Sequence, residues 1–282
     1  MPLSRTVTLT VLAMLAFAGN SLLCRAALQH TGMDAATFTS VRLATGAATL
    51  AVLVAWRKSG PAWRAGNWPS AAALCVYAAG FSFAYVSLTA ATGALLLFGA
   101  VQATMIGHGL YRGERLGPLP LAGLVLAFAG IGALLLPGLS APPLGAAALM
   151  LLAGVAWGVY SLRGRSGGDA TDTTAGNFLR ATPLALLLSI ATLGHTAWDA
   201  PGLAYAAASG ALASGVGYAL WYAALPQLRA TQAATVQLSV PVLAALGGVA
   251  LLGEPLTLRL TLATVAILGG IGLVIRERTP RV

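Results

Sequence analysis

The chain is a series of long apolar stretches separated by short segments that carry charged residues, prolines or glycines. No Asp, Glu, Lys or Arg occurs over 65–111 or over 116–162, and shorter uncharged stretches occupy most of the remaining sequence. The apolar runs are continuous, whereas a strand of a membrane barrel alternates apolar and polar residues. The pattern therefore predicts helices, since a helix satisfies its backbone polar groups internally in lipid.

Each of the two long uncharged stretches can hold two spans of about 20 residues and a short turn. The first is expected to turn near Thr89 to Gly93, and the second breaks at the proline- and glycine-rich segment 137–143. We therefore predict an all-α membrane protein with ten transmembrane helices, at 6–28, 36–56, 69–88, 92–111, 119–136, 144–163, 176–193, 202–223, 231–252 and 259–275.

The composition agrees with this pattern. Of 282 residues, 58% are hydrophobic and 8% are charged, whereas a soluble domain carries roughly 25% charged residues. The longest polar segments, 57–67 and 164–175, are too short to enclose a core of their own. A soluble globular protein is therefore excluded.

The 16 basic residues are distributed unevenly between the two ends of the predicted helices. With the N-terminus in the cytoplasm, all but Arg25, Arg42 and Arg259 fall on the inner side, which is the asymmetry typical of membrane proteins. The chain is also rich in Ala and Arg, which is typical of a GC-rich bacterial genome. We predict a multi-pass protein of the bacterial inner (cytoplasmic) membrane, with cytoplasmic N- and C-termini. The net charge of +9 then attracts anionic membrane lipid, and no nucleic-acid partner is expected.

Three features of the first half allow other interpretations. The first twenty residues resemble a signal peptide, with Arg5 and an Ala16-Phe17-Ala18 sequence, but removal would leave nine helices, so we expect them to form the first helix. Cys24 and Cys75 lack metal or redox spacing and should pack within helices. The small pair Gly123 and Ala127 should pack within one chain rather than make a dimer, so we expect a monomer.

The sequence matches itself at an offset of 140 residues. Seven of the 23 positions over 113–135 are identical to their counterparts, and the same offset places Arg25 on Arg165 and Glu114 on Glu254. Each repeat unit holds five predicted helices, and an odd number of spans makes the second unit enter from the opposite face. We therefore predict two inverted five-helix repeats, 1–138 and 139–282, the construction of many secondary transporters.

These motifs resemble those of a known family. They are Gly-Glu-x-Leu at the ends of the fourth and ninth helices, Gly-Ile-Gly in the fifth and tenth, and Trp157-Gly158 in the sixth. The chain resembles the drug/metabolite transporter superfamily, and within it the ten-helix EamA-type exporters, among which bacterial exporters of aromatic amino acids are the most similar. Phe17 stands at the first-repeat counterpart of Trp157, which departs from strict repetition.

Aromatic side chains recur at helical spacing in two predicted helices: Tyr77, Phe81 and Tyr85 in the third, and Tyr218, Trp221 and Tyr222 in the eighth. Such stripes pack helices together, lie at the lipid interface or line a substrate path. Tyr77 and Phe81 lie near mid-span, where an interfacial position does not fit. Polar side chains within spans, such as Asn20, Ser21 and Gln237, are expected to face the bundle interior.

The resemblance implies a central cavity lined by helices one, three, four, six, eight and nine. Rings there provide stacking, and amides or hydroxyls bind the polar end of a small solute. Gln102 and Gln237 either contact substrate or join helices, and Pro241 either kinks the ninth helix or acts as a hinge. The candidate substrate-binding residues are Phe17, Asn20, Tyr77, Phe81, Tyr85, Gln102, Trp157, Tyr160, Tyr218, Trp221, Gln237 and Ser239.

Acidic residues are missing from the middle of every predicted span. All seven carboxylates are assigned to loops, helix ends or the tail, so none is placed to carry a proton at mid-membrane. His108 could titrate within a span, but we expect it to be packed and hydrogen-bonded. No catalytic residue, cofactor or metal is expected, and facilitated transport is favoured over obligate proton antiport.

The sequence therefore predicts a secondary transporter that exports amino acids, aromatic and other neutral ones, or similar small metabolites by alternating access. The partners expected are a small-molecule substrate and membrane lipid. Efflux of drugs or lipophilic cations is the alternative, although such cargo favours a buried carboxylate. An enzyme would need converging acids or a nucleophile and base within the membrane, and a channel would need charged rings or a carbonyl filter.

Overall fold

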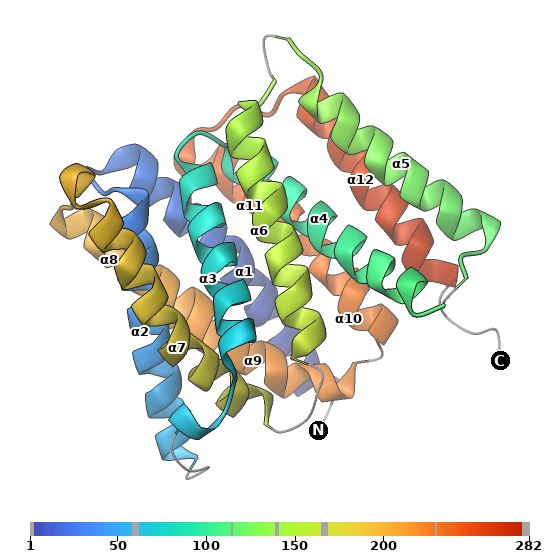
Figure 1. Ribbon diagram of the computed structural model, residues 1–282. Coiled ribbons are helices and arrows are strands. Elements are labelled where there is room, and N and C mark those ends of the chain that lie inside the picture. Colours follow the sequence, from blue (N-terminus) through green and yellow to red (C-terminus); the bar gives the residue numbers. More distant parts are fainter. Residues whose placement is uncertain are drawn as a thin grey trace.

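The computed structural model describes residues 3–57, 62–113, 115–138, 141–164, 169–228 and 230–277. These ranges are helical and contain no strand, which confirms the all-α prediction (Figure 1). The elements are α1 (Leu3–His30), α2 (Ala35–Trp56), η1 (Ala62–Arg64), α3 (Trp68–Tyr85), α4 (Ala90–Tyr111), α5 (Pro118–Leu135), α6 (Leu144–Arg163), α7 (Ala170–Ala191), η2 (Leu193–His195), α8 (Ala200–Ala208), η3 (Ser209–Val216), α9 (Gly217–Ala224), η4 (Leu225–Gln227), α10 (Ala230–Gln237), α11 (Ser239–Leu252) and α12 (Leu258–Glu277).

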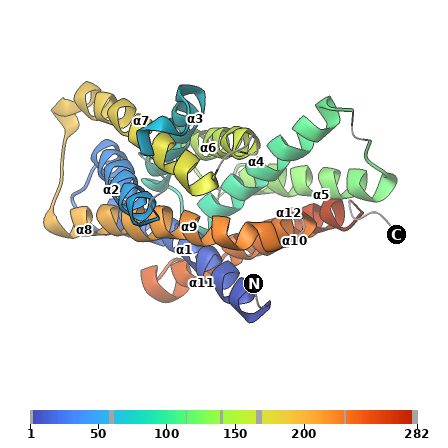
Figure 2. The same cartoon turned by 90° about the horizontal axis from the view of Figure 1, so that it is seen from below.

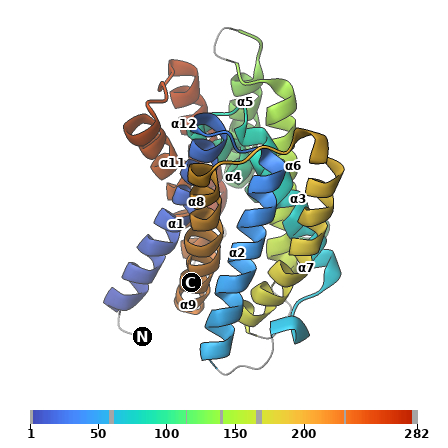
Figure 3. The ribbon, with the colours of Figure 1, turned by 90° about the vertical axis from the view of Figure 1, so that its left-hand side faces the viewer.

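Within the described residues, eight helical segments are long and apolar enough to cross a membrane. In this set α8, η3, α9 and η4 form one continuous segment beside α2 (Figure 3). Helix α10 continues into α11. Helices α3 and α7 stand at the two remaining predicted positions, but Tyr and Ser residues in α3 and Asn177 and Arg180 within α7 make them less apolar. Ten crossings, and the inverted repeats, therefore remain predictions.

Two predicted boundaries are wrong. Helix α7 begins at Ala170 rather than 176, because the Asp169 side chain accepts hydrogen bonds from the backbone N–H groups of Thr171 and Asp172 and so starts the helix early. The turn between α3 and α4 lies over 86–89 and precedes the predicted 89–93, because Thr89 caps α4 in the same way.

Two irregular segments interrupt the long helices of the second half. Residues Ser209–Val216 form a π-helix, η3, which the apolar pattern did not predict. The break between α10 and α11 falls at Leu238, whose N–H bonds to the carbonyl of Thr235, and Pro241 follows in the first turn of α11. Since proline has no N–H to donate to the preceding turn, this break lies next to the position where a kink or a hinge was expected.

The loop carboxylates hold helix starts and join loops. Asp34 caps α2, and its Oδ2 accepts a bond from the N–H of Ala197 at 3.0 Å. Asp199 caps α8 in the second half and accepts a bond from the N–H of Gly32 at 2.8 Å. The N–H groups of Gly32 and Gly202 hold the pKa of Asp199 below its usual value. These carboxylates therefore link the α1–α2 loop to the loop before α8.

Helices α5 and α12 form a closely packed pair at one side of the bundle (Figures 1 and 2). A Cβ atom at Gly123 would lie 2.5 Å from the carbonyl oxygen of Gly270, and one at Gly270 would lie 2.7 Å from the backbone nitrogen of Ala127. The two backbones can meet only because both positions are glycine. The expectation that Gly123 and Ala127 pack within the chain is thereby confirmed.

We expect the substitution Gly123→Ala to destabilise the protein by about 1–3 kcal/mol, because the added methyl group forces α5 away from α12. Gly132→Ala in the same helix is the matched control, since nothing lies within 4 Å of a Cβ there. Thermal unfolding of the two purified variants in detergent measures the difference. Equal melting temperatures would contradict the close packing at Gly123.

Candidate functional site

Trp157 of α6 is the centre of a group of aromatic rings contributed by four helical segments. Its ring stacks on Tyr160 and on Tyr218, with centroids 5.3 and 5.2 Å away, and lies 4.8 Å from the ring of Tyr77. Phe17 of α1 contacts Tyr218 at 5.6 Å from the other side. Rings separated by such distances attract one another beyond simple burial. The group joins α1, α3, α6 and the α8–α9 segment.

A small cavity of about 30 Å³ lies among these rings. That space holds about two water molecules, so an amino acid enters only after the walls separate. Eleven residues line it: Phe17, Asn20, Ser21, Tyr77, Phe81, Leu97, Phe98, Trp157, Ala213, Tyr218 and Gln237. Seven of the twelve predicted binding residues are among them, drawn from both halves of the chain. Their role in binding substrate stays a prediction.

Arg42 of α2 is buried directly behind this cavity wall. Its side chain is 1% exposed, and its guanidinium carbon lies 5.1 Å from the ring centroid of Tyr77 and 4.8 Å from that of Phe81. The sequence analysis counted Arg42 among the arginines at the outer ends of the helices, whereas the structure buries it two turns inside α2. A charged residue within a span is usually functional, and this rule could have identified Arg42.

A short chain of polar side chains connects Arg42 with α1 and η3. Its Nη2 donates to the hydroxyl of Tyr77 at 2.9 Å, and the amide of Asn20 donates to the same oxygen at 3.3 Å. Asn20 Oδ1 accepts a 2.6 Å bond from the Ser209 hydroxyl, and Arg42 Nε makes a longer contact of 3.4 Å with Ser214. The predicted inward orientation of Asn20 is therefore confirmed.

Small residues allow α2 and η3 to approach closely at this point. A Cβ atom at Gly46 would lie 3.2 Å from the Gly210 carbonyl of η3, and one at Gly210 would overlap the Thr45 hydroxyl and the Arg42 carbonyl. The wide turn of the π-helix presents Ser209 and its neighbours to α2. A π-helical turn of this kind is frequent at functional sites, and here it brings the hydroxyls of the polar chain to Arg42.

Five predicted binding residues lie outside the cavity lining. Tyr160 and Trp221 contact its rings from behind, Trp221 through Phe17 at 6.1 Å. Tyr85 is fully buried against Gly93 and donates to the Ala90 carbonyl, so it packs the turn between α3 and α4. Helical spacing gave the same weight to all of these rings because it does not show how each helix is rotated.

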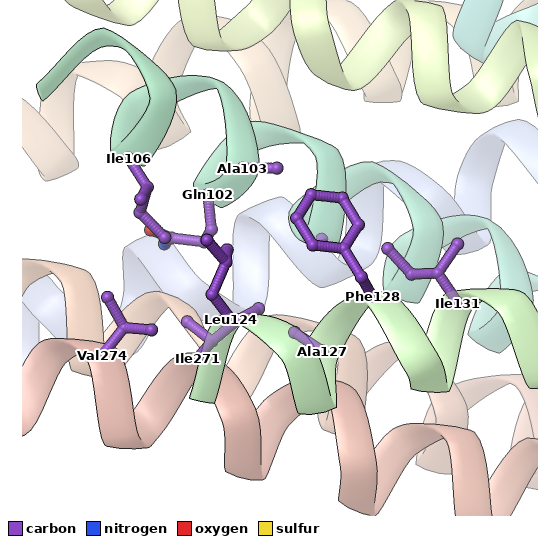
Figure 4. A pocket seen from close by; sticks show the side chains of 10 residues that line it. Gln102, Ala103, Ile106, Leu124, Ala127, Phe128, Ile131, Ile271 and Val274 are labelled. Carbon is purple, nitrogen blue, oxygen red and sulfur yellow. The ribbon is translucent and has the colours of Figure 1, made fainter. Parts of the chain in front are cut away.

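Gln102 and Ser239 are also placed elsewhere. Gln102 lies with Ala103 and Ile106 of α4 over α5 and α12, in a separate and mostly apolar pocket (Figure 4). Ser239 donates to the carbonyl of Val236 and so stabilises the break between α10 and α11. Neither residue reaches the central cavity, although both are polar and within predicted spans.

His108 differs from its predicted environment. It was expected to be packed and hydrogen-bonded, but its side chain is exposed in the last turn of α4. The carboxylates whose side chains are described, Asp34, Asp169, Asp172, Asp199 and Glu254, stand at helix ends as predicted. Glu114 and Arg165, which the internal repeat pairs with Glu254 and Arg25, lie outside the described residues.

An ion pair closes the end of the bundle where α1 and α11 end and α4 begins, here named the Glu254 end. Arg25 Nε lies 3.0 Å from Glu254 Oε1, and both side chains are about nine-tenths buried. Arg25 Nη1 also donates to the carbonyls of Tyr85 and Val86, while Glu254 Oε2 accepts from the N–H of Ala90 at 2.8 Å. The cation thus meets the end of α3 and the anion meets the start of α4, as helix dipoles favour.

Comparison with known proteins identifies relatives of the whole chain. Residues 144–276 match the EamA-like transporter family. An uncharacterized protein of Pseudomonas aeruginosa is 62% identical over 281 residues, which cover 100% of this chain and 98% of that protein. An uncharacterized transporter of Archaeoglobus fulgidus is 28% identical over 180 residues, 62% of this chain and 63% of that protein.

A protein of known crystal structure shares the fold from end to end, with a TM-score of 0.68 and 19% identity over 99% of each chain. The apolar helices, together with the EamA-like match and the archaeal transporter relative, indicate a multi-pass membrane transport protein. Residues 144–276, most of the second half of the chain, therefore form a domain similar to the EamA-like transporter family.

We expect Glu254→Gln to open the Glu254 end, because Arg25 loses its charged partner. Cys24, the fully buried neighbour of Arg25, reports this opening in a Cys75→Ala background. Maleimide labelling of Cys24 should accelerate about tenfold, which corresponds to about 1.4 kcal/mol of lost stabilisation.

The matched control for this experiment is Asp169→Asn. This substitution breaks the ion pair between Arg57 Nη2 and Asp169 Oδ2, which are 2.7 Å apart, and leaves the Glu254 end intact. Cys24 should then react at the rate of the parent protein. An unchanged rate in Glu254→Gln would show that the ion pair does not hold this end closed.

Proposed function

We propose that the protein is a secondary transporter that exports amino acids, aromatic and other neutral ones, or similar small metabolites by alternating access. The central cavity carries this proposal, because α1 and α3 of the first half and α6 and α9 of the second each contribute aromatic rings to it. A cavity between two halves of a membrane bundle is where a rocking transporter binds its cargo.

The helix packing supports two inverted repeats, 1–138 and 139–282. Helix α6 packs on α3 and α4, and its counterpart α1 packs on the α8–α9 segment and α11. Helices α2 and α7 pack on each other, as do α5 and α12. If the first repeat is superimposed on the second and the second on the first, each of these helix–helix contacts falls on another contact of the same set. Such an arrangement gives the inward-open and outward-open forms similar energies.

The positions of the arginines support cytoplasmic termini in a bacterial inner membrane. Arg57, Arg112 and Arg163 follow or end helices at the end of the bundle opposite Glu254, and Arg180 donates to the carbonyls of Ala65 and Trp63 there. The positive-inside rule assigns this end to the cytoplasm. The Glu254 end then faces outward, and the ion pair of Glu254 closes the outer side of the cavity.

The surroundings of the cavity favour a neutral or zwitterionic solute over a lipophilic cation. Arg42 places a fixed positive charge within the wall, which repels a cation. None of the eleven lining residues is acidic, so a drug cation would meet no counter-charge. Since the carboxylates with described side chains all stand at helix ends, we also propose facilitated transport without obligate proton coupling.

Counterflow in proteoliposomes tests the proposal. Vesicles loaded with unlabelled phenylalanine should take up labelled phenylalanine, tryptophan, threonine or methionine in a saturable manner, because exchange needs only binding and reorientation. Collapse of the pH gradient with an ionophore should leave the exchange rate unchanged. Protein-free vesicles provide the background.

Exchange of a cationic dye with no exchange of any amino acid would replace the proposal with drug efflux. Loss of exchange on collapse of the pH gradient would show proton coupling. A flux that does not saturate would indicate a channel.

We expect Trp157→Ala to lower counterflow about tenfold or more, because several stacked rings at about 0.5–1.5 kcal/mol per pair lose their centre. Trp157→Phe should restore most of the rate. Trp198→Ala is the matched control, since Trp198 is exposed outside the cavity. Equal rates for the two alanine variants, each normalised to folded protein by size-exclusion chromatography, would contradict a role for the cavity.

A further inference from the structure

We propose that Arg42 and Tyr77 form a binding site for the carboxylate of the transported solute. The proposal rests on the transport function above and defines its substrate class more closely. The cargo is a monocarboxylate with an apolar or aromatic body, and its ammonium group, where it has one, contributes little to recognition.

The charge of Arg42 is the first observation. The guanidinium is buried, and the faces of Tyr77 and Phe81 stabilise it in part through cation–π contact. Both ion pairs within the described residues, Arg25–Glu254 and Arg57–Asp169, lie at the ends of the bundle. Arg42 thus carries a positive charge that no described carboxylate neutralises. A buried charge without a counter-ion is costly, and a solute anion supplies one.

The hydrogen-bonding capacity left over at this point fits a carboxylate. Nη1 of Arg42 is buried and has no hydrogen-bond partner among the described residues. The Tyr77 oxygen accepts two bonds, from Arg42 and Asn20, so its own O–H remains to donate. Two neighbouring donors thus remain, and a carboxylate has two oxygens that accept bonds of this charge-assisted kind.

The position of the donors relative to the cavity completes the site. Tyr77 and Phe81 line the cavity on one side and contact Arg42 on the other. Ser214, which Arg42 contacts, follows the lining residue Ala213. In the proposed site, a carboxylate bound at the Tyr77 hydroxyl reaches Nη1 when the Tyr77 ring tilts. The apolar body of the same solute then lies against the remaining rings of the lining: Phe17, Trp157 and Tyr218.

The cavity lining also bears on whether the solute needs an amine in order to bind. An ammonium group is bound most strongly by a carboxylate, and the eleven lining residues include neither Asp nor Glu. Amide and hydroxyl oxygens of Asn20, Ser21 and Gln237 are the acceptors that the lining offers. The site therefore discriminates by the acid of the solute. Aromatic acids without an amine should bind as well as the corresponding amino acids.

The experiment compares solutes that differ in one group, with full-length protein in proteoliposomes. Labelled phenylalanine is exchanged against an excess of phenylalanine, 3-phenylpropionate, phenylalaninamide or phenethylamine inside the vesicle. We expect phenylalanine and 3-phenylpropionate to drive uptake to a similar extent. The amide and the amine, which lack the carboxylate, should drive it at least about tenfold less, the value of one lost charge-assisted contact.

Three variants connect this preference with the two side chains. The ratio of interest is the uptake driven by 3-phenylpropionate divided by the uptake driven by phenylalaninamide. Arg42→Gln and Tyr77→Phe should each reduce this ratio about tenfold. Arg42→Lys should retain part of the ratio, because it keeps the charge but loses the planar pair of donors. The matched controls, Arg112→Gln and Tyr205→Phe, change exposed residues of the same types and should leave the ratio at the parent value.

A variant that misfolds is recognised by loss of its monodisperse size-exclusion peak, and Tyr77→Phe, which keeps the ring, then provides the test. A parent protein that exchanges the acid and the amide equally, or variants that keep the full preference, would overturn the carboxylate site and leave the transport function standing. Exchange of none of the four solutes, together with uptake of a cationic dye, would overturn the proposed function itself.

Discussion

A positive charge inside a membrane-spanning bundle is the constraint around which the centre of this protein is organised. No carboxylate of the described residues pairs with Arg42, which is held by the faces of two rings, a phenol oxygen and a serine. Each of these groups belongs to α3 or η3, so the charge fixes how these elements pack around α2. The same groups form or adjoin the cavity wall. The side chains that stabilise the charge of Arg42 therefore also determine the shape of the site.

Close helix packing makes that arrangement possible. Glycines remove side-chain bulk where the backbones meet: at Gly154 a Cβ atom would lie 2.6 Å from the Leu97 carbonyl, and at Gly158 it would lie 2.8 Å from Thr104. Packing in lipid depends on such small residues, because apolar side chains gain little from leaving lipid for a protein interior. Helix α6 can therefore approach α4 closely and still present Trp157 to the cavity.

Much of the fold was predictable, because charges are excluded from apolar spans and the uncharged stretches show where helices lie. Helix starts in polar segments were harder to predict from the sequence. Helix α7, for example, begins early because the Asp169 side chain caps it. In the site, spacing found Tyr77, Phe81 and Tyr218, but it also selected Gln102 and Tyr85, since the rotation of a helix depends on its neighbours. Arg42 was missed because it was counted as a topology charge, and η3 because its Ser, Gly and Ala residues suit an ordinary helix equally well.

The π-helix η3 has a mechanical consequence. In an α-helix each residue turns the chain by about 100° and advances it by about 1.5 Å. The eight residues of η3 are wound more widely, so a change of this segment to α-helical winding would rotate all that follows it, Tyr218 and Trp221 included, relative to Ser209. The aromatic wall would then turn away from Trp157 while the hydroxyl that bonds Asn20 stays in place. A local change of winding, without hinge motion in a loop, can thus reshape one wall of the cavity.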